Sequence, residues 1–132
     1  MATIKKIEDL EIWILARKLC SLIITLTEKG KFVSDFGLKQ QIKNSSGSVM
    51  DNIAEGFGRG GNKELVNFLS IAIGSCCEVK SQLYRALDWK YISDVEFKEC
   101  VALTEEIISK SGSLINYLNK SEHKGEKFKN RK

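Results

Sequence analysis

A chain of 132 residues is long enough for one globular domain but too short to enclose two hydrophobic cores. Its 42% hydrophobic content argues against wholesale disorder, and the absence of proline permits long uninterrupted helices. The formal net charge of +4 resides mainly at the C-terminus, because residues 121–132 hold five basic and two acidic side chains. We therefore expect a nearly neutral folded body followed by a basic tail.

Targeting segments and metal sites are not predicted. Charged side chains interrupt the first ten residues, so no signal peptide is recognisable, and no apolar run approaches the roughly 20 residues that span a bilayer. We expect a cytoplasmic protein. The four cysteines, at positions 20, 76, 77 and 100, form no C-x-x-C pair, and the single histidine, His123, lies in the tail. The pattern favours reduced cysteines packed as small hydrophobic residues, with no metal and no cofactor.

In chain order, four segments space their apolar residues as helices do, over about 7–28, 35–56, 62–89 and 94–119. The strongest stripe, in the third segment, alternates steps of four and three over three heptads. The principal stripes are Ile12, Leu15, Leu19, Leu22 and Leu26; Leu38, Ile42, Ser45, Val49 and Ile53; Leu65, Leu69, Ala72, Cys76, Val79, Leu83 and Ala86; and Phe97, Val101, Thr104, Ile108, Ser111, Ile115 and Leu118.

Polar and glycine residues mark the predicted helix ends. Ser34 or Asp35 can cap the second helix, Asn62 the third, and Ser93 or Asp94 the fourth. Gly56 is placed as a left-handed C-terminal cap of the second helix. Trp89 and Tyr91 are expected to close one end of the bundle. Four helices joined by three short connections predict an all-α, antiparallel, up-down-up-down four-helix bundle over residues 1–120, with a basic, disordered tail at 121–132.

Three of the helices carry a second apolar stripe beside the first. Either the core is broad, or the additional residues form a subunit interface, because monomers rarely leave a large apolar patch in water. The interface is the interpretation we favour. The residues at issue are Ile12, Leu22, Ile71, Ile73, Leu103 and Leu114.

One segment carries more information than its periodicity. Residues 52–59 read Asn-Ile-Ala-Glu-Gly-Phe-Gly-Arg, and this order resembles the signature of bacterial four-helix-bundle proteins encoded in intervening sequences of 23S ribosomal RNA genes. The resemblance continues upstream in residues 36–42 and downstream in residues 63–83, so that it covers about residues 10–92. It implies an all-helical bundle that assembles as a homo-oligomer, a pentameric ring, with no established enzymatic activity. A related set of bundle proteins, the accessory proteins of diversity-generating retroelements, binds nucleic acid through basic surface.

The motif has a structural and a functional interpretation. Asn52, Glu55 and Arg59 are separated by three and four residues, so their side chains can form a network that locks the turn with Gly56 and Gly58. Alternatively, Arg59 and Lys63 can contact nucleic acid beside the positive N-terminus of the third helix. The full set of candidate nucleic-acid contacts is Lys39, Lys43, Arg59, Lys63, Lys124, Lys127, Lys129, Arg131 and Lys132.

Catalysis is not predicted, because the body lacks a histidine to act with a cysteine, serine or carboxylate. Two non-enzymatic functions remain. The chain can bind RNA or DNA through basic surface and tail, and an oligomer would multiply the phosphate contacts. Alternatively, it can be a structural scaffold that recruits a protein partner through apolar surface. Salt separates the two, because phosphate binding weakens steeply with salt and an apolar interface does not.

Overall fold

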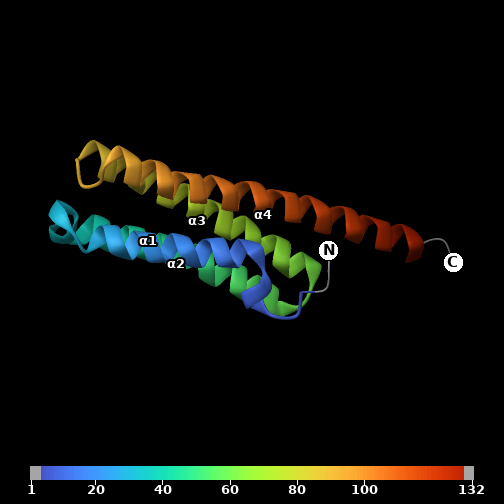
Figure 1. Cartoon of the computed structure of the whole chain (residues 1–132). Helices are drawn as coiled ribbons and strands as arrows, with labels where there is room; N and C mark the ends of the chain where they lie inside the picture. Colours follow the sequence, from blue (N-terminus) through green and yellow to red (C-terminus); the bar gives the residue numbers. More distant parts are fainter. Residues whose placement is uncertain (1–3, 130–132) are drawn as a thin grey trace.

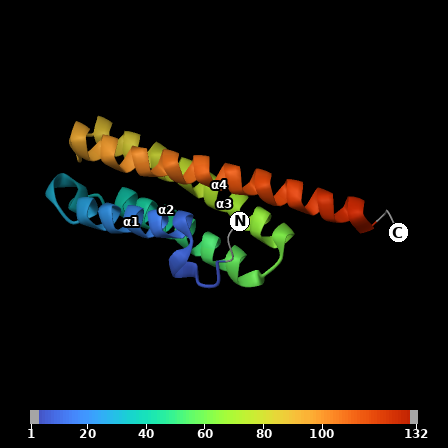
Figure 2. The ribbon, with the colours of Figure 1, turned by 45° about the vertical axis from the view of Figure 1, so that its right-hand side comes forward.

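The computed structural model describes the backbone of residues 4–129 and the side chains of residues 4–121. Four α-helices follow one another: α1 (Glu11–Thr27), α2 (Phe36–Arg59), α3 (Asn62–Asp88) and α4 (Asp94–Lys129). Two short 3₁₀-helices, η1 (Ile7–Asp9) and η2 (Gly30–Ser34), precede α1 and α2. Each α-helix packs on the next, and α4 returns to α1, so the helices occupy the four corners of a bundle (Figures 1 and 2). The predicted all-α up-down-up-down bundle is confirmed.

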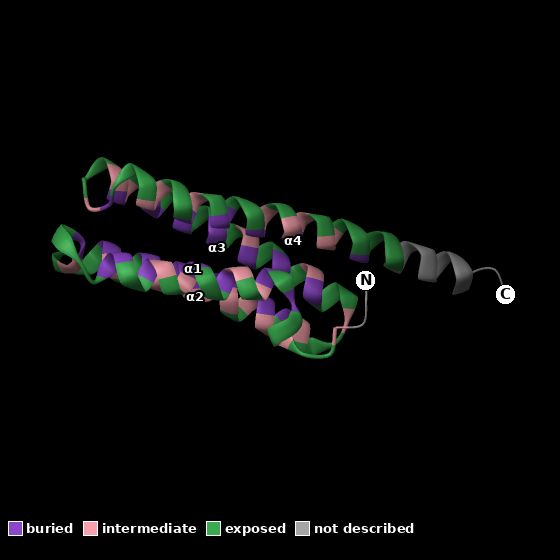
Figure 3. Cartoon of the chain, in the orientation of Figure 1, coloured by how far each residue is buried: buried purple, intermediate pink, exposed green. Residues whose placement is uncertain are grey.

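The bundle core follows the predicted 4-3 stripes. The central positions of every helix are buried, as Figure 3 shows by colour. The largest fully buried side chains come from α1 to α4 and from η2: Leu19, Ile23, Phe32, Leu38, Ile42, Ile53, Leu69, Leu83 and Ile107. Burying each such side chain is worth about 1.5–3 kcal/mol, so this continuous core is the main stabilising feature.

The second apolar stripes divide between core and surface. Ile12 and Leu103 are buried in the core, whereas Leu22, Ile73 and Leu114 are half-buried at its margin. Ile71 remains 51% exposed. Broad packing within one bundle therefore accounts for part of the doubled stripes, and the exposed remainder is available to a partner.

Side-chain hydrogen bonds cap the N-terminus at two of the three predicted helix starts. The Asp35 carboxylate accepts a hydrogen bond from the Leu38 N–H at 3.0 Å, which caps α2. Ser93 and Glu96 form a reciprocal capping box on α4, at 3.1 and 2.9 Å. The prediction for Asn62 is wrong: Gly61 is the N-cap residue of α3, and Asn62 is already helical.

Two predicted helix ends are also corrected. α2 continues through Gly56 to Arg59 and ends at Gly60, whose φ of 82° is the left-handed conformation that glycine readily adopts. α4 is helical to Lys129 instead of ending near residue 119. Residues 120–129 lack an apolar stripe, but they are rich in lysine and glutamate, which are good helix formers. The expected irregular tail from residue 121 is therefore wrong for the backbone up to Lys129.

Candidate functional site

The signature segment forms the last turns of α2, directly before the turn into α3. Arg59 and Glu55 are one helical turn apart, and Arg59 Nη2 lies 3.1 Å from Glu55 Oε1. The Arg59 guanidinium also lies over the ring of Phe68 on α3, 5.2 Å from its centroid. Arg59 thereby joins the end of α2 to α3. Both partners of the ion pair are more than half exposed, so the pair adds at most about 1 kcal/mol to stability.

Asn52 does not join this pair, and the predicted three-residue network is wrong. Its Nδ2 donates instead to the Ser48 carbonyl oxygen at 2.8 Å and to Ser48 Oγ at 2.9 Å. Ser48 Oγ is also 2.9 Å from Ser75 Oγ of α3. Asn52 therefore faces back along α2 because its donors find a partly buried inter-helix hydroxyl pair within reach. The network connects α2 to α3 one turn below the Glu55–Arg59 pair.

Gly56 of α2 packs tightly against α3. A Cβ built on Gly56 would lie 2.8 Å from Phe68 Cβ and 3.3 Å from the Leu65 Cα. Gly56 is buried within the helix, so close helix approach, not chain reversal, requires glycine at this position.

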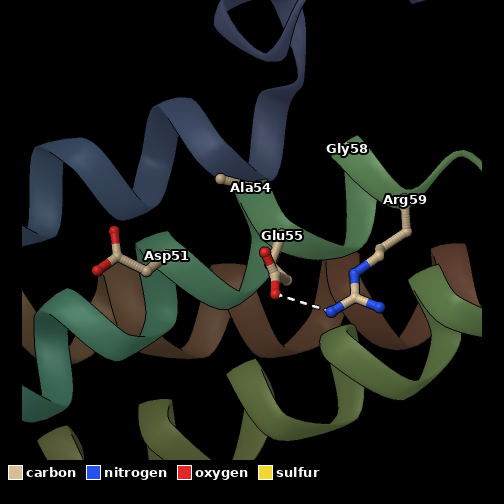
Figure 4. A pocket seen from close by; sticks show the side chains of 5 residues that line it. All are labelled: Asp51, Ala54, Glu55, Gly58 and Arg59. Atoms are coloured by element: carbon tan, nitrogen blue, oxygen red, sulfur yellow. Dashed lines mark hydrogen bonds and ion pairs between the residues drawn. The ribbon is translucent and has the colours of Figure 1, made fainter.

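An open depression of about 410 Å³ lies on the outer side of the same part of α2 (Figure 4). Asp51, Ala54, Glu55, Gly58 and Arg59 line it. Glu55 and Arg59 point toward each other, whereas Asp51 forms no ion pair with a described residue. The depression thus has an unpaired carboxylate at Asp51. At Gly58 no side chain fills it, and a Cβ there would meet no atom within 4 Å.

The predicted basic residues of the body do not form one cluster. Lys39 and Arg59 lie about 30 Å apart along α2, given a rise of 1.5 Å per residue. Lys39 Nζ is 2.9 Å from Glu28 Oε1, and this contact lowers the pKa of the Glu28 carboxyl. Lys43, one turn along, is half-buried, and Lys63 is exposed at the start of α3. The structure therefore separates Lys39 and Lys43 from Arg59 and Lys63.

A different set of cations shares one end of the bundle. The N-terminal segment and the α2–α3 turn lie at this end, and α4 projects past them (Figures 1 and 2). Lys5, Lys6, Lys63 and Lys120 of these segments are exposed and form no ion pair with another described residue. The exposed carboxylates of Glu8, Asp9 and Glu64 belong to the same segments. We call the four lysines the basic end. The side chains of Lys124, Lys127, Lys129, Arg131 and Lys132 lie outside the described residues.

Aromatic residues gather at the opposite end. The rings of Phe32 and Tyr91 are 5.4 Å apart, and Trp89 meets Tyr91 at 5.9 Å. Tyr91 donates its hydroxyl proton to Asp35 Oδ2 at 2.9 Å. The Leu38 N–H and then the Tyr91 hydroxyl lower the pKa of Asp35, and the same bond to Asp35 raises the pKa of Tyr91. Trp89 and Tyr91 thus close the bundle as predicted. Phe36, the first residue of α2, is 77% exposed at the same end, and the spacing of apolar residues did not predict this exposure.

The cysteines differ in their surroundings. All four are free; Cys76 and Cys100 are buried, Cys20 is half-buried, and Cys77 is exposed. Burial raises the pKa of Cys76 to about 12 and that of Cys100 to about 11. The prediction of packed, reduced thiols therefore fails only for Cys77, which lies on the outer side of α3.

The fold and the signature segment coincide with a known family. The model of the 23S rRNA-intervening sequence protein family matches residues 8–113, which is most of the chain. The chain belongs to this family. The match spans all of α1, α2 and α3 and the bundled part of α4, so the resemblance inferred from residues 52–59 is confirmed.

A solved structure supports the family fold. A protein of unknown function from the S23 ribosomal protein family of Bacteroides thetaiotaomicron, known at 1.70 Å resolution, superposes with a TM-score of 0.72 at 20% identity. The match covers 79% of this chain and 97% of that chain. At this identity the likeness shows the fold alone. No match was found among curated proteins.

None of the helices in the described part of the chain is long and apolar enough to cross a membrane. Within the same residues, no group of three or more histidine, cysteine, aspartate or glutamate side chains is arranged to hold a metal ion.

Proposed function

We propose that this 23S rRNA-intervening sequence protein is a non-catalytic, oligomeric bundle of the cytoplasm that binds RNA or DNA at its basic end. The observation that carries the proposal is the convergence of three separate segments at one end of the bundle (Figure 1). Lys5 and Lys6 come from the N-terminal segment, Lys63 from the start of α3, and Lys120 from α4. Lysines presented together bind phosphate without reading base sequence.

The projecting part of α4 adds to this end. Its helical backbone continues to Lys129, and residues 121–132 contribute five basic side chains against two acidic ones in the sequence. In a homo-oligomer, such as the pentamer that we propose from the family resemblance, copies of this segment would multiply the phosphate contacts. Affinity then rises with each counterion released. The single histidine lies in the same segment, at position 123, which supports a binding role over catalysis.

A charge-neutralisation experiment tests the proposal on the full-length chain. Lys124, Lys127, Lys129, Arg131 and Lys132 are changed together to glutamine, and binding to short fluorescent RNA and DNA is followed by anisotropy. We expect affinity at low salt to fall at least about tenfold, since five phosphate contacts are lost. The control variant, with the exposed Lys31 and Lys98 changed to glutamine, lies away from the basic end and should keep wild-type affinity within about twofold. Equal affinity of the wild type and the five-residue variant would contradict the proposal.

Exposed apolar side chains favour a second candidate function, a scaffold that recruits a protein partner. Ile14 and Ile24 on α1, Ile71 on α3 and Val95 on α4 are between 45% and 76% exposed. Exposed apolar side chains that form a contiguous patch are typical of interaction surfaces. A scaffold of this kind would capture a protein partner with an affinity that changes little between low and moderate salt, and the five-residue variant would bind that partner normally.

A further inference from the structure

A groove of about 410 Å³ lies between the N-terminal segment, the start of α1 and the later turns of α4. Its rim carries the Ser113 hydroxyl and the ion pair between Glu11 Oε1 and Lys110 Nζ, which are 2.8 Å apart. A volume of this size lies within the range of small-molecule pockets, roughly 300–1,000 Å³. We call this feature the α1–α4 groove. The side chains that line the rest of it are apolar: Ile4, Leu10, Ile12 and Leu114.

An exposed aromatic ring continues the α1–α4 groove along α4. Tyr117 is 47% exposed, and it lies four residues after Ser113 and three after Leu114. This spacing places the three residues on one side of the helix. Helical side chains lean toward the N-terminus of their helix, which from Tyr117 is the direction of the groove. The flat ring therefore offers a stacking surface beside an apolar recess.

Exposed lysines flank the groove and the ring. Lys5 and Lys6 directly follow Ile4, which lines the groove. Lys120 lies seven residues after Ser113, two turns further along the same side of α4. Cations on either side of an aromatic surface are the arrangement with which proteins hold a single strand, since the cations contact its phosphates and the ring stacks on a base.

The carboxylates near the groove decide which part of a nucleic acid enters it. Glu11 stands at the rim, and Glu8 and Asp9 lie in η1 shortly before it. These charges repel phosphate, so the phosphates are held at the lysines outside the groove. A base edge carries N–H donors, and the Glu11 carboxylate keeps acceptor capacity beside its contact with Lys110. The groove is therefore suited to a base and not to the sugar-phosphate backbone.

From these observations we propose that the α1–α4 groove and Tyr117 bind unpaired bases, so that the chain selects single-stranded RNA or DNA over duplex. A base inside a duplex is paired and stacked, and it reaches a protein pocket only when the duplex opens. Contacts to phosphate alone favour the duplex, which has the higher charge density, so a preference for single strands comes from the bases. The inference rests on the proposed function and names its substrate class.

Paired substrates of one sequence test the selectivity on the full-length chain. Anisotropy gives the affinity for a short fluorescent single strand and for the same strand annealed to its complement, at equal salt. We expect the single strand to bind at least about tenfold more tightly, as one or two stacked bases provide.

Substitutions of Tyr117 test the stacking surface. Tyr117→Ala should lower the single-strand affinity about tenfold without changing the salt slope, because no phosphate contact is lost. Tyr117→Phe keeps the ring and should stay within about twofold of the wild type. Tyr84→Ala is the matched control, since Tyr84 is 49% exposed near the end of α3 that lies away from the basic end. Circular dichroism establishes that each variant is folded before its affinity is compared.

Photochemical cross-linking locates the base independently of affinity. Single strands that contain 5-iodouracil are irradiated together with the full-length chain, and peptide mass spectrometry maps the adducts. We expect adducts at Tyr117.

The outcomes separate this inference from the broader proposal. A duplex affinity equal to or above the single-strand affinity overturns the inference and leaves nucleic-acid binding at the basic end in place. Wild-type affinity of Tyr117→Ala for single strands, an equal loss in Tyr117→Phe, or adducts confined to residues 122–132 also overturns it. Absence of binding to either probe at low salt overturns the proposed function together with the inference.

Discussion

Gly56 of α2 lies against Phe68 of α3 so closely that an added Cβ would stand 2.8 Å from the Phe68 Cβ. The Leu65 Cα, a backbone atom, would be 3.3 Å away. Neither neighbour can rotate out of the way, because both atoms are fixed to the α3 backbone. The glycine therefore sets the distance between α2 and α3 beside the Arg59–Glu55 pair.

We predict that Gly56→Ala destabilises the bundle by about 1–3 kcal/mol, because overpacking forces the two helices apart. Gly74→Ala is the matched control, since a Cβ at that exposed helical position meets nothing within 4 Å. It should stabilise the chain by about 0.5–1 kcal/mol through the higher helix propensity of alanine. Chemical denaturation measures both free energies of unfolding, and a stable Gly56→Ala variant would show that the helices can separate without cost.

The Ser48–Ser75 hydroxyl pair is predicted to contribute to the α2–α3 contact. Ser75→Ala removes the partner of Ser48 Oγ at a position that is only 6% exposed. We expect a loss of about 1 kcal/mol, the usual net value of a hydrogen bond. In the control Ser70→Ala, the lost bond is an exposed one to the Val66 carbonyl within α3, and stability should change by less than half as much. Equal effects of the two changes on the denaturation midpoint would argue against an inter-helix role.

The Asp35–Tyr91 contact predicts two opposite dependences of stability on pH. The pKa of Asp35 is lower when folded, so this carboxylate stabilises the bundle above its unfolded pKa, and the contribution is lost as pH falls through the folded pKa. The pKa of Tyr91 is higher when folded, so its contribution is present below its unfolded pKa and is lost as pH rises through the folded pKa.

Tyr91→Phe isolates the hydrogen bond between these residues. The Asp35 pKa should move up toward its ordinary value in the variant, but the Leu38 N–H should still hold it below that value. A carbon-13 NMR titration of the Asp35 carboxyl measures the pKa directly. An unchanged Asp35 pKa in Tyr91→Phe would mean that the two side chains do not interact in solution.

Thiol reactivity should distinguish the four cysteines. Cys77 is exposed, whereas burial raises the pKa values of Cys20, Cys76 and Cys100, which lowers their thiolate fractions. Iodoacetamide at pH 8 should therefore modify Cys77 first, and the other three should react only after unfolding. Peptide mass spectrometry locates the adducts, and rapid labelling of Cys76 in the native chain would conflict with the packing described above.

The helices could be predicted because each one repeats a single physical requirement along its length. The stripe of Leu65, Leu69, Ala72 and Cys76 needs no knowledge of neighbouring helices, since its 4-3 spacing already defines a buried side. Capping by Asp35 and Ser93 is equally local. These features depend on residues only three or four positions apart, and the prediction was correct for both.

The errors arise where a residue's role depends on another helix or on distances in the folded chain. A glycine near a helix end is typical of a C-terminal cap, but Gly56 is required by Phe68, which the order of residues 52–59 cannot reveal. Asn52 was expected to meet Glu55, but it bonds to Ser48 because Ser75 of α3 brings another hydroxyl to that point. Likewise, the apparent basic cluster depends on distances along α2 that separate its members.

The site at the basic end could be predicted only in part. Lys63 was a predicted contact, but its location at the same end as Lys5 and Lys6 depends on the direction in which each helix runs. The acidic depression depends on Asp51 having no ion pair with a described residue while Glu55 pairs with Arg59, and only side-chain positions reveal this difference. The family signature at residues 52–59 correctly indicated the connection between α2 and α3, but it indicated neither the basic end nor the depression beside Asp51.

The salt dependence of nucleic-acid binding tests the central claim most directly. The affinity of the full-length chain for short single-stranded RNA and DNA should fall steeply between about 50 and 200 mM salt, by roughly 100-fold if five phosphates are contacted. The variant with glutamine at the five basic positions of residues 121–132 should show a much shallower slope. No binding at the lowest salt, or binding whose affinity is independent of salt, would contradict the proposed function and favour a protein-binding scaffold.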